Sequence, residues 1–249
     1  MIIGISGVAG TGKDTVASIL VDNHLFVRIA LADVIKRIVR DVFDFSESQL
    51  WGPSEKRNEI DYRYPRNLDR LPAEARKAYE RLRLVDDVAK AEFAKLGIEF
   101  LTPRYALQTS ATNWARNCYP DIWVEYTLRI VKQLLKRDYN YGDYIFRYSP
   151  QMGLYNDVMF IYSDKLNKLP AGVVISDVRF LNEFNAIKKM GGKMWRLTRL
   201  DAGLSGDAGQ HVSETEQAII PDSEFNAIVT NDGTVEELAK KIADLLGHQ

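Results

Sequence analysis

The sequence predicts an α/β fold, in which helices cover a buried sheet. Residues 1–6 form an apolar run that is too short for a helix and is stopped by glycine, as a buried parallel strand would be. A second apolar run, 171–177, ends in a carboxylate. Apolar residues recur at helical spacing in segments such as 13–21 and 33–42. These three observations together favour strands alternating with amphipathic helices.

A glycine-rich turn follows the first run. Gly7 is followed by four residues and then by Gly12 and Lys13, which is the spacing of a phosphate-binding loop. Glycines let backbone N–H groups close around an anion, and the next helix aims its positive N-terminus at that anion. The alternative is a turn without a ligand, but the complete glycine, lysine and hydroxyl set favours the phosphate loop. Residues predicted to bind nucleotide here are Gly7, Gly10, Thr11, Gly12, Lys13, Asp14 and Thr15.

The position after the lysine departs from the usual loop. A Ser or Thr is expected there as a ligand of Mg²⁺, but the chain has Asp14, with Thr15 one place later. Either the Asp14 carboxylate holds the metal through water or Thr15 substitutes. Asp177, at the end of the run 171–177, is the third predicted metal residue, because such strands carry a metal-directed carboxylate beside a phosphate loop.

Composition limits the alternatives. The 249 residues favour one domain with insertions, and 46% hydrophobic with 27% charged residues argues against disorder. A net charge of −1 gives no global field for nucleic acid. With Cys118 as the only cysteine we expect no disulfide framework and no zinc cluster, as in a reducing cytoplasm. No apolar stretch approaches ~18 residues, so neither a membrane span nor a signal peptide is expected.

The remaining core segments follow in order. A strand is predicted at 25–31, and Asp33 opens the next helix, either as an ordinary helix-start acid or as a substrate ligand. Helix 122–135, strands 193–199 and 225–230, and helix 235–246 complete the core. The segment of about 200–220, which begins with a glycine-rich stretch, is a candidate lid.

Two insertions interrupt this core. Residues 45–103 are charge-rich, and 73–96 is predicted to be one long polar helix whose charges form a solvated face. Residues 138–170 are rich in tyrosine, which would form either a partner interface, as in a homodimer, or ordinary packing. The predicted core is therefore 1–44, 104–137 and 171–249 within a single domain, 1–249.

Two further groups of side chains suit a second ligand. Gln108, Thr112 and Arg116 recur at four-residue steps, near Trp114 and Trp123, which suits a phosphate plus a flat base. The alternative is a helix with core tryptophans and a hydrated polar row. Asp177, with Arg179 and Glu183 after it, lies where an open α/β sheet binds ligands, unless Asp177 and Arg179 form a structural ion pair.

Together these segments resemble the bacteriophage-type deoxynucleoside monophosphate kinases, within the P-loop nucleoside monophosphate kinase superfamily. The residues that carry the resemblance are Ser6-Gly7 through Gly12-Lys13-Asp14-Thr15, Leu107-Gln108, Thr112, Trp114, Arg116, Asp121-Ile122-Trp123, Ser176-Asp177-Val178-Arg179, Asn182-Glu183, His211-Val212-Ser213-Glu214 and Asn231-Asp232-Gly233-Thr234. They occur in family order over nearly the whole chain, and the Lys-Asp variant of the loop is a family feature. Departures are Ala111 where the family has glycine, Leu200 where it has proline, and the tyrosine-rich insertion.

The resemblance implies a nucleoside monophosphate kinase-like fold with three layers, a parallel sheet of about five strands, a helical insertion and a lid. It implies transfer of the γ-phosphoryl of ATP, with Mg²⁺, to a deoxynucleoside monophosphate in the cytoplasm of an infected cell. Catalytic roles fall on Lys13, Asp14, Arg179 and Arg199, and Asn231 and Gly233 would border the adenine. The implied surroundings of the monophosphate are Arg104, Gln108, Thr112, Arg116, Trp123, Asp177, Arg179 and Glu183. Asp33 and Trp114 are further candidate substrate residues.

Other interpretations stay open. Animal-type phosphomevalonate kinase is similar in the Gly-Lys-Asp loop, and some phage kinases phosphorylate hydroxymethyluracil in DNA. Trp114 and Trp123 with Gln108 favour a base over an isoprenoid acid, and the net charge disfavours DNA. A nucleotide-gated binding module is a third alternative, against which the acceptor-side arginines argue.

Overall fold

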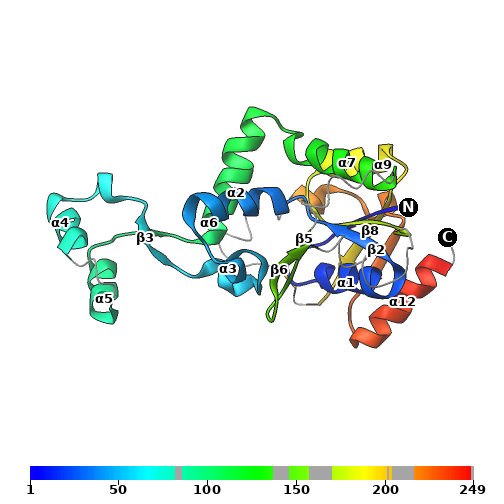
Figure 1. The fold of residues 1–249 in the computed structure, drawn as a ribbon, viewed down its shortest axis with the longest axis horizontal. Helices are drawn as coiled ribbons and strands as arrows, with labels where there is room; N and C mark the ends of the chain where they lie inside the picture. Colours follow the sequence, from blue (N-terminus) through cyan, green and yellow to red (C-terminus); the bar gives the residue numbers. More distant parts are fainter. Residues whose placement is uncertain (82–85, 137–145, 157–169, 201, 204–215, 248–249) are drawn as a thin grey trace. The chain divides into compact units, whose positions relative to one another are not determined.

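The structure is a computed structural model that describes residues 1–81, 86–136, 146–156, 170–200, 202–203 and 216–247 (Figure 1). The chain divides into two compact units. The sheet unit comprises Met1–Val34, Ala115–Arg147 and Leu154–Gln249, and the inserted unit comprises Ile35–Trp114 and Tyr148–Gly153. That the whole chain is a single domain stays a prediction.

The sheet unit is built on five strands. Their spatial order is β2 (Phe26–Ile29), β7 (Gly172–Val178), β1 (Ile2–Ser6), β8 (Lys193–Thr198) and β9 (Ala227–Thr230). Each neighbouring pair is parallel. The predicted parallel sheet of about five strands is therefore confirmed. β1 lies at its centre, so the loop after β1 lies at the middle of the carboxyl edge.

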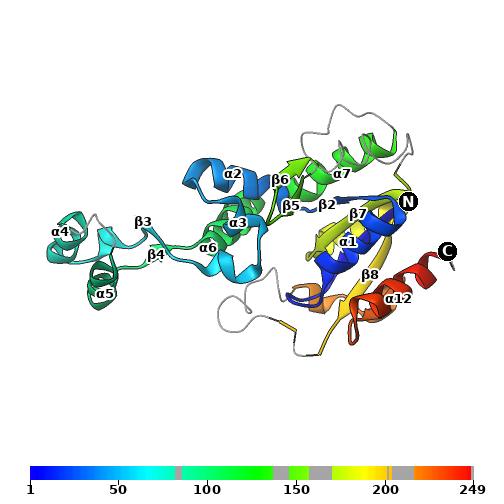
Figure 2. The same cartoon turned by 60° about the horizontal axis from the view of Figure 1, so that its bottom comes forward.

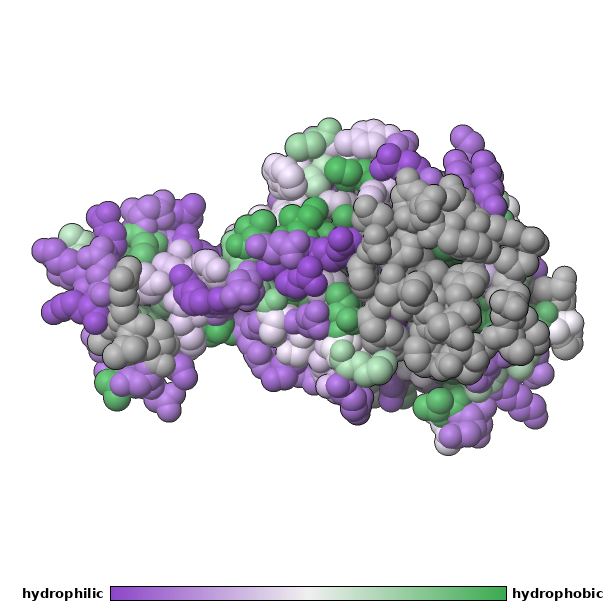
Figure 3. Space-filling view, in the orientation of Figure 1, coloured by the Kyte–Doolittle hydropathy of each residue, from purple (hydrophilic) through white to green (hydrophobic). Residues whose placement is uncertain are grey.

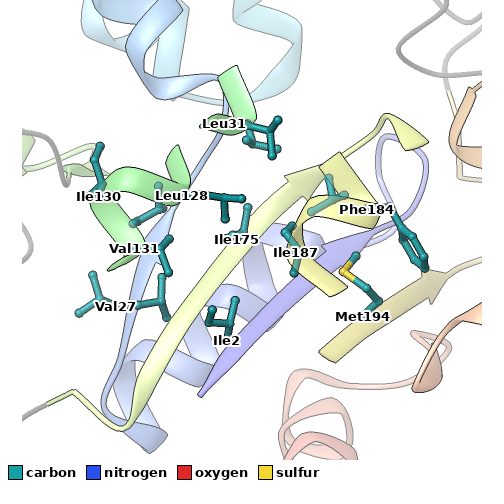
Figure 4. Close-up of a cluster of buried hydrophobic side chains, with 14 of the residues drawn as sticks. Ile2, Val27, Leu31, Leu128, Ile130, Val131, Ile175, Phe184, Ile187 and Met194 are labelled. Atoms are coloured by element: carbon teal, nitrogen blue, oxygen red, sulfur yellow. The ribbon is translucent and has the colours of Figure 1, made fainter. Parts of the chain in front are cut away.

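Helices cover both faces of this sheet (Figures 1 and 2). Among the described residues, these helices are α1 (Lys13–His24), α7 (Ile122–Leu135), α9 (Leu181–Lys189) and α12 (Val235–Gly247). Ile2 of β1 packs in the cluster on the side of α7 and α9 (Figure 4). Ile3 instead packs with α1 and α12. The alternation follows from the two-residue repeat of a strand. Each fully buried aliphatic side chain contributes roughly 1.5–3 kcal/mol, so these two clusters hold the three layers together.

The inserted unit has its own small core. Its elements are α2 (Asp33–Phe43, which starts in the sheet unit), α3 (Glu47–Trp51), η1 (Ser54–Asn58), β3 (Asp61–Pro65), η2 (Leu68–Arg70), α4 (Ala73–Arg81), α5 (Asp87–Lys95), β4 (Phe100–Leu101), α6 (Pro103–Gln108) and most of the π-helix η3 (Thr109–Arg116). Phe93, Ala89 and Ile98 are buried, with Tyr62 and Phe100 packed against them. Around this core, the surface over α4 and α5 is mainly hydrophilic, at the left of Figure 3. This agrees with the expected solvated face.

The prediction of one long helix over 73–96 is wrong. α4 ends at Arg81, and Asp86 is extended, with φ −88° and ψ 178°. The Asp86 carboxylate accepts a hydrogen bond from Ala89 N at 2.8 Å and so caps a new helix, α5. An aspartate stabilises a helix start because it satisfies an N–H group that has no intrahelical partner. The same insertion contains two strands that the sequence analysis did not predict, β3 and β4, which pair as an antiparallel sheet.

The tyrosine-rich insertion is described only in part. β5 (Phe146–Ser149) and β6 (Gly153–Asn156) form a two-stranded sheet. Residues 138–145 and 157–169 of this insertion lie outside the described residues. So do residues 201 and 204–215 of the predicted lid. The lid and the homodimer interface therefore stay predictions.

Candidate active site

The predicted phosphate loop joins the central strand to a helix. β1 ends at Ser6, and α1 begins at Lys13. Gly10 has φ +84° and Gly12 has φ +96°, a left-handed backbone that residues with a Cβ rarely adopt. The strand–loop–helix context predicted from the glycine spacing is thus present. The loop lies at the carboxyl edge of a parallel sheet, where such folds bind ligands.

Close packing also restricts two loop positions to glycine. A Cβ on Gly7 would lie 2.5 Å from the backbone oxygen of Leu197, in β8. A Cβ on Gly12 would collide with the amide nitrogen of Asn231. That nitrogen donates to the Thr11 oxygen at 2.9 Å. Asn231 therefore lies against the phosphate loop, whereas Gly233 lies in the turn before α12, beside Glu237.

Lys13 lies across the loop. Its Nζ donates to Gly7 O at 2.5 Å and to Val8 O at 2.9 Å. These carbonyls are neutral acceptors, and an ammonium group binds more strongly to an ionised one. A phosphate at the loop would therefore compete for Lys13 with two weaker partners. The structure is compatible with the predicted contact of Lys13 with a nucleotide.

Asp14 pairs with a residue that the sequence did not single out. Arg28, on β2, donates from Nη2 to Asp14 Oδ1 at 2.6 Å and from Nε to Ser176 Oγ at 3.0 Å. The Asp14 side chain is 79% exposed, so this ion pair is solvated. Thr15 follows it in the first turn of α1. Carboxylate and hydroxyl oxygens beside a phosphate loop are the ligand types that Mg²⁺ takes in proteins, so Asp14 and Thr15 fit the predicted metal.

Asp177 and Asp33 both hold the chain between β2 and α2. The Asp177 carboxylate accepts from Leu31 N at 2.7 Å and from Ala32 N at 3.0 Å. Asp33, the first residue of α2, accepts from Ala30 N at 3.2 Å. Asp33 thus has the first-turn position expected of a helix-start acid, and its role as substrate ligand stays a prediction. The metal and substrate roles of Asp177 also stay predictions.

A buried ion pair lies near the end of β7. Arg116 donates from Nη2 to Glu183, and its guanidinium lies 3.7 Å from the centre of the Phe180 ring. The other Glu183 oxygen accepts from Arg179 N at 2.8 Å and from Phe180 N at 3.0 Å. Glu183 is only 2% exposed. We call Arg116, Phe180 and Glu183 the Arg116 cluster.

The electrostatics of this cluster are dominated by burial. Desolvation raises the pKa of the Glu183 carboxyl, while Arg116 and the two backbone N–H groups lower it in opposition. Because its oxygens are all used within the protein, Glu183 here supports Arg116 and the backbone of Arg179. A contact between Glu183 and a substrate stays a prediction.

The other predicted site residues lie in different surroundings. Trp123 is 7% exposed and so is packed, as in the alternative interpretation, whereas Trp114 is 61% exposed. Arg199 is exposed, directly after β8. Within the inserted unit, Arg104 donates to Asn58 Oδ1 at 2.6 Å. Gln108 ends α6 and Thr112 lies in the π-helix, a conformation often found at functional sites.

Two contacts with the site were missed from the sequence. Arg28 left a weak signal, since it is a lone charge in the apolar run 25–31. Gln217 left none, although its side chain accepts a hydrogen bond from Gly7 N at 3.2 Å. Among the described residues, no group of three or more His, Cys, Asp or Glu side chains is arranged to hold a metal ion. No helix in the same part of the chain is both long and apolar enough to cross a membrane.

Comparison with known proteins gave two curated relatives. The chain is 27% identical over 243 residues to a putative deoxynucleotide monophosphate kinase of Acanthamoeba polyphaga mimivirus, covering 97% of this chain and 94% of that protein. It is 24% identical over 250 residues to the deoxynucleotide monophosphate kinase of Enterobacteria phage T4, covering 98% of each chain.

No protein-family model matches the chain. Among solved structures, TT1252 from Thermus thermophilus aligns at 16% identity with a TM-score of 0.36, covering 100% of this chain and 97% of that one. A likeness this weak carries no argument. The two sequence relatives match this chain along nearly its whole length. They confirm the resemblance to the bacteriophage-type deoxynucleoside monophosphate kinases that the motifs predicted.

Proposed function

We propose that this chain is a deoxynucleoside monophosphate kinase that transfers the γ-phosphoryl group of ATP to the 5′-phosphate of a deoxynucleotide. The similarity to two proteins named deoxynucleotide monophosphate kinase supports an enzyme that phosphorylates a nucleotide. The observation that carries the proposal is the phosphate loop at the carboxyl end of the central strand, with the Lys13 ammonium across it.

The reaction makes one bond and breaks one. An oxygen of the acceptor 5′-phosphate attacks the γ-phosphorus, and the bond from that phosphorus to the bridging oxygen breaks, so that ADP leaves with the electron pair. Such transfers depend mainly on positioning and charge stabilisation. Lys13 and the loop N–H groups would hold the β- and γ-phosphates, and Arg179 would span the acceptor phosphate and the transferring group.

Mg²⁺ would be held by Asp14 or Thr15, with Asp177 as a further candidate. When bound, the ion neutralises charge on the phosphate oxygens. Sites of this kind use one or two protein oxygens together with the phosphates and water, so a cluster of acids is not required. Arg28 has to share or release the Asp14 carboxylate for this to happen, because the two are joined at 2.6 Å.

Fewer observations support the acceptor pocket than support the phosphate loop. Arg116 is the best supported residue, because Glu183 and Phe180 fix its guanidinium at the carboxyl edge of the sheet. Roles for Gln108, Thr112 and Trp114 are proposed from their spacing and the resemblance. A role for Arg104, and an adenine contact by Asn231 and Gly233, are proposed from the resemblance alone. A cytoplasmic role in deoxynucleotide supply for phage DNA synthesis, without membrane or nucleic-acid partners, completes the proposal.

A coupled assay of ADP release tests the reaction. Purified protein with ATP and Mg²⁺ is given each common deoxynucleoside monophosphate, phosphomevalonate, DNA containing hydroxymethyluracil, or no acceptor. We expect ADP release above the acceptor-free rate only with one or more deoxynucleotides. A Lys13→Ala preparation run in parallel controls for contaminating kinases. Release with another acceptor, or a rate that no acceptor increases, would contradict the proposal.

A further inference from the structure

Gln217 is a buried polar residue next to the phosphate loop. It lies in a single 3₁₀ turn, η5 (Glu216–Ile219), and is 4% exposed. Its Oε1 accepts from Gly7 N at 3.2 Å and from Ser6 Oγ at 3.5 Å, the outer limit for such a bond. A buried amide is costly unless it is hydrogen-bonded, so these contacts account for its side-chain oxygen.

The backbone of η5 is itself fixed to the sheet. Arg196, on β8, donates from Nη2 to Gln217 O at 3.0 Å and to Ile220 O at 2.5 Å. The same guanidinium pairs with Asp222 and lies 4.2 Å from the centre of the Phe225 ring. An arginine held on several sides loses little further freedom on binding, so it makes a rigid support. The Gln217 side chain is therefore presented to Gly7 from a fixed position.

Gly7 joins β1 to the phosphate loop. Its φ is +147°, and a Cβ there would meet the backbone oxygen of Leu197. Its peptide oxygen accepts from Lys13, while its N–H donates to Gln217. If Lys13 turns towards a bound phosphate, the oxygen loses that contact and the bond to Gln217 stays. The contact with Gln217 would then restrain Gly7 while a phosphate is bound at the loop.

We propose that Gln217 is a positioning residue that fixes the N–H of Gly7 and so keeps the phosphate loop in its anion-binding shape. It acts through the loop and needs no contact with the nucleotide. The proposal rests on the proposed function only in so far as the anion is the phosphate of ATP. The restraint on Gly7 itself can be measured without any ligand.

The test compares three variants of the full chain with the parent. Gln217→Met keeps the length of the side chain and removes the acceptor, whereas Gln217→Glu keeps an acceptor oxygen. Ile219→Ala changes an exposed residue of the same turn and is the control. Amide hydrogen exchange measures the protection of the Gly7 N–H, and direct titration with ATP and Mg²⁺ measures the affinity for the nucleotide.

In Gln217→Met we expect exchange at Gly7 to be about fivefold faster and the ATP dissociation constant to be about fivefold higher, as for one net hydrogen bond. Exchange within β1 should not change. Gln217→Glu should keep the slow exchange at Gly7, and Ile219→Ala should match the parent in both measurements. If Gln217→Met exchanges at Gly7 like the parent, or Gln217→Glu exchanges as fast as Gln217→Met, the inference is overturned. A parent that fails to bind ATP would instead overturn the proposed function, while the exchange result would still decide the role of Gln217.

Discussion

The predicted phosphate loop and the Arg116 cluster would bind an anion by two different means. The loop has glycines in left-handed conformations and one lysine that donates to backbone carbonyls, and its backbone N–H groups are predicted to face the anion. The Arg116 cluster instead fixes a guanidinium with a buried carboxylate and an aromatic ring. A loop of this kind can lose its charge without losing the fold. A buried ion pair cannot, because removing one partner leaves the other uncompensated.

The largest expected effect is at Arg179, next to the cluster. Its backbone is held by Glu183, and its side chain is proposed to span the two phosphates. Arg179→Ala should bind ATP like the parent and lose on the order of 10³-fold in kcat, the range for an arginine that stabilises the transferring group. Steady-state kinetics with direct ATP titration measure both. Arg129→Ala, at an exposed arginine of α7, is the control. Parent-like transfer would leave Arg179 with a structural role.

Lys13→Ala should have the next largest effect, on the loop side. Removing one preorganised charge-stabilising donor costs about 10²-fold or more in kcat. The melting temperature should hardly change, because the hydrogen bonds from Lys13 Nζ to Gly7 O and Val8 O are made to neutral backbone carbonyls. Lys240→Ala, at an exposed lysine of α12, is the matched control. A folded Lys13→Ala protein with a near-parent rate would mean that the loop does not bind the transferred phosphate.

Glu183→Ala tests the opposite expectation for the cluster. It leaves Arg116 without its carboxylate and two backbone N–H groups without an acceptor, so we expect a loss of about 3 kcal/mol in unfolding free energy. Chemical denaturation followed by circular dichroism gives this value. Glu183→Gln keeps an oxygen for the N–H groups and should lose less. Equal stabilities of Glu183→Ala and the parent would remove the distinction between the two regions.

The smallest expected effect concerns Asp14 and its ion pair. Asp14→Asn should raise the Mg²⁺ concentration for half-maximal activity by a few-fold, because a metal oxygen ligand loses its charge. Arg28→Ala should lower it, because Asp14 loses a competing cation. Magnesium titrations of both variants and the parent provide the comparison. Shifts in the same direction, or none, would move the metal role to Thr15 or Asp177.

The sheet could be predicted from sequence because its signals are local. Short apolar runs bounded by glycine, such as 1–6 and 171–177, became β1 and β7, and the glycine spacing became the loop. The break at Asp86 was missed because helical spacing continues on both sides of it. The only local signal of the break was the capping aspartate itself, a single polar residue within a continuous helical pattern.

The contacts around the site could not be predicted because they are not local. Ser176 lies 148 residues from Arg28 along the chain, and Gln217 lies 210 residues from Gly7. No spacing rule reaches across such distances, and only the order of the strands brings these side chains together. The structural role of Glu183 could not be predicted either, because the sequence does not show whether a carboxylate is buried or exposed.

Transfer of a labelled phosphoryl group tests the central claim most directly. The protein is incubated with Mg²⁺ and ATP labelled at the γ-phosphate, with and without deoxynucleoside monophosphates, and the products are separated by chromatography. We predict that the label appears in a deoxynucleoside diphosphate, in amounts equal to the ADP formed. Label found only in inorganic phosphate, whichever deoxynucleotide is present, would contradict the assignment as a deoxynucleoside monophosphate kinase.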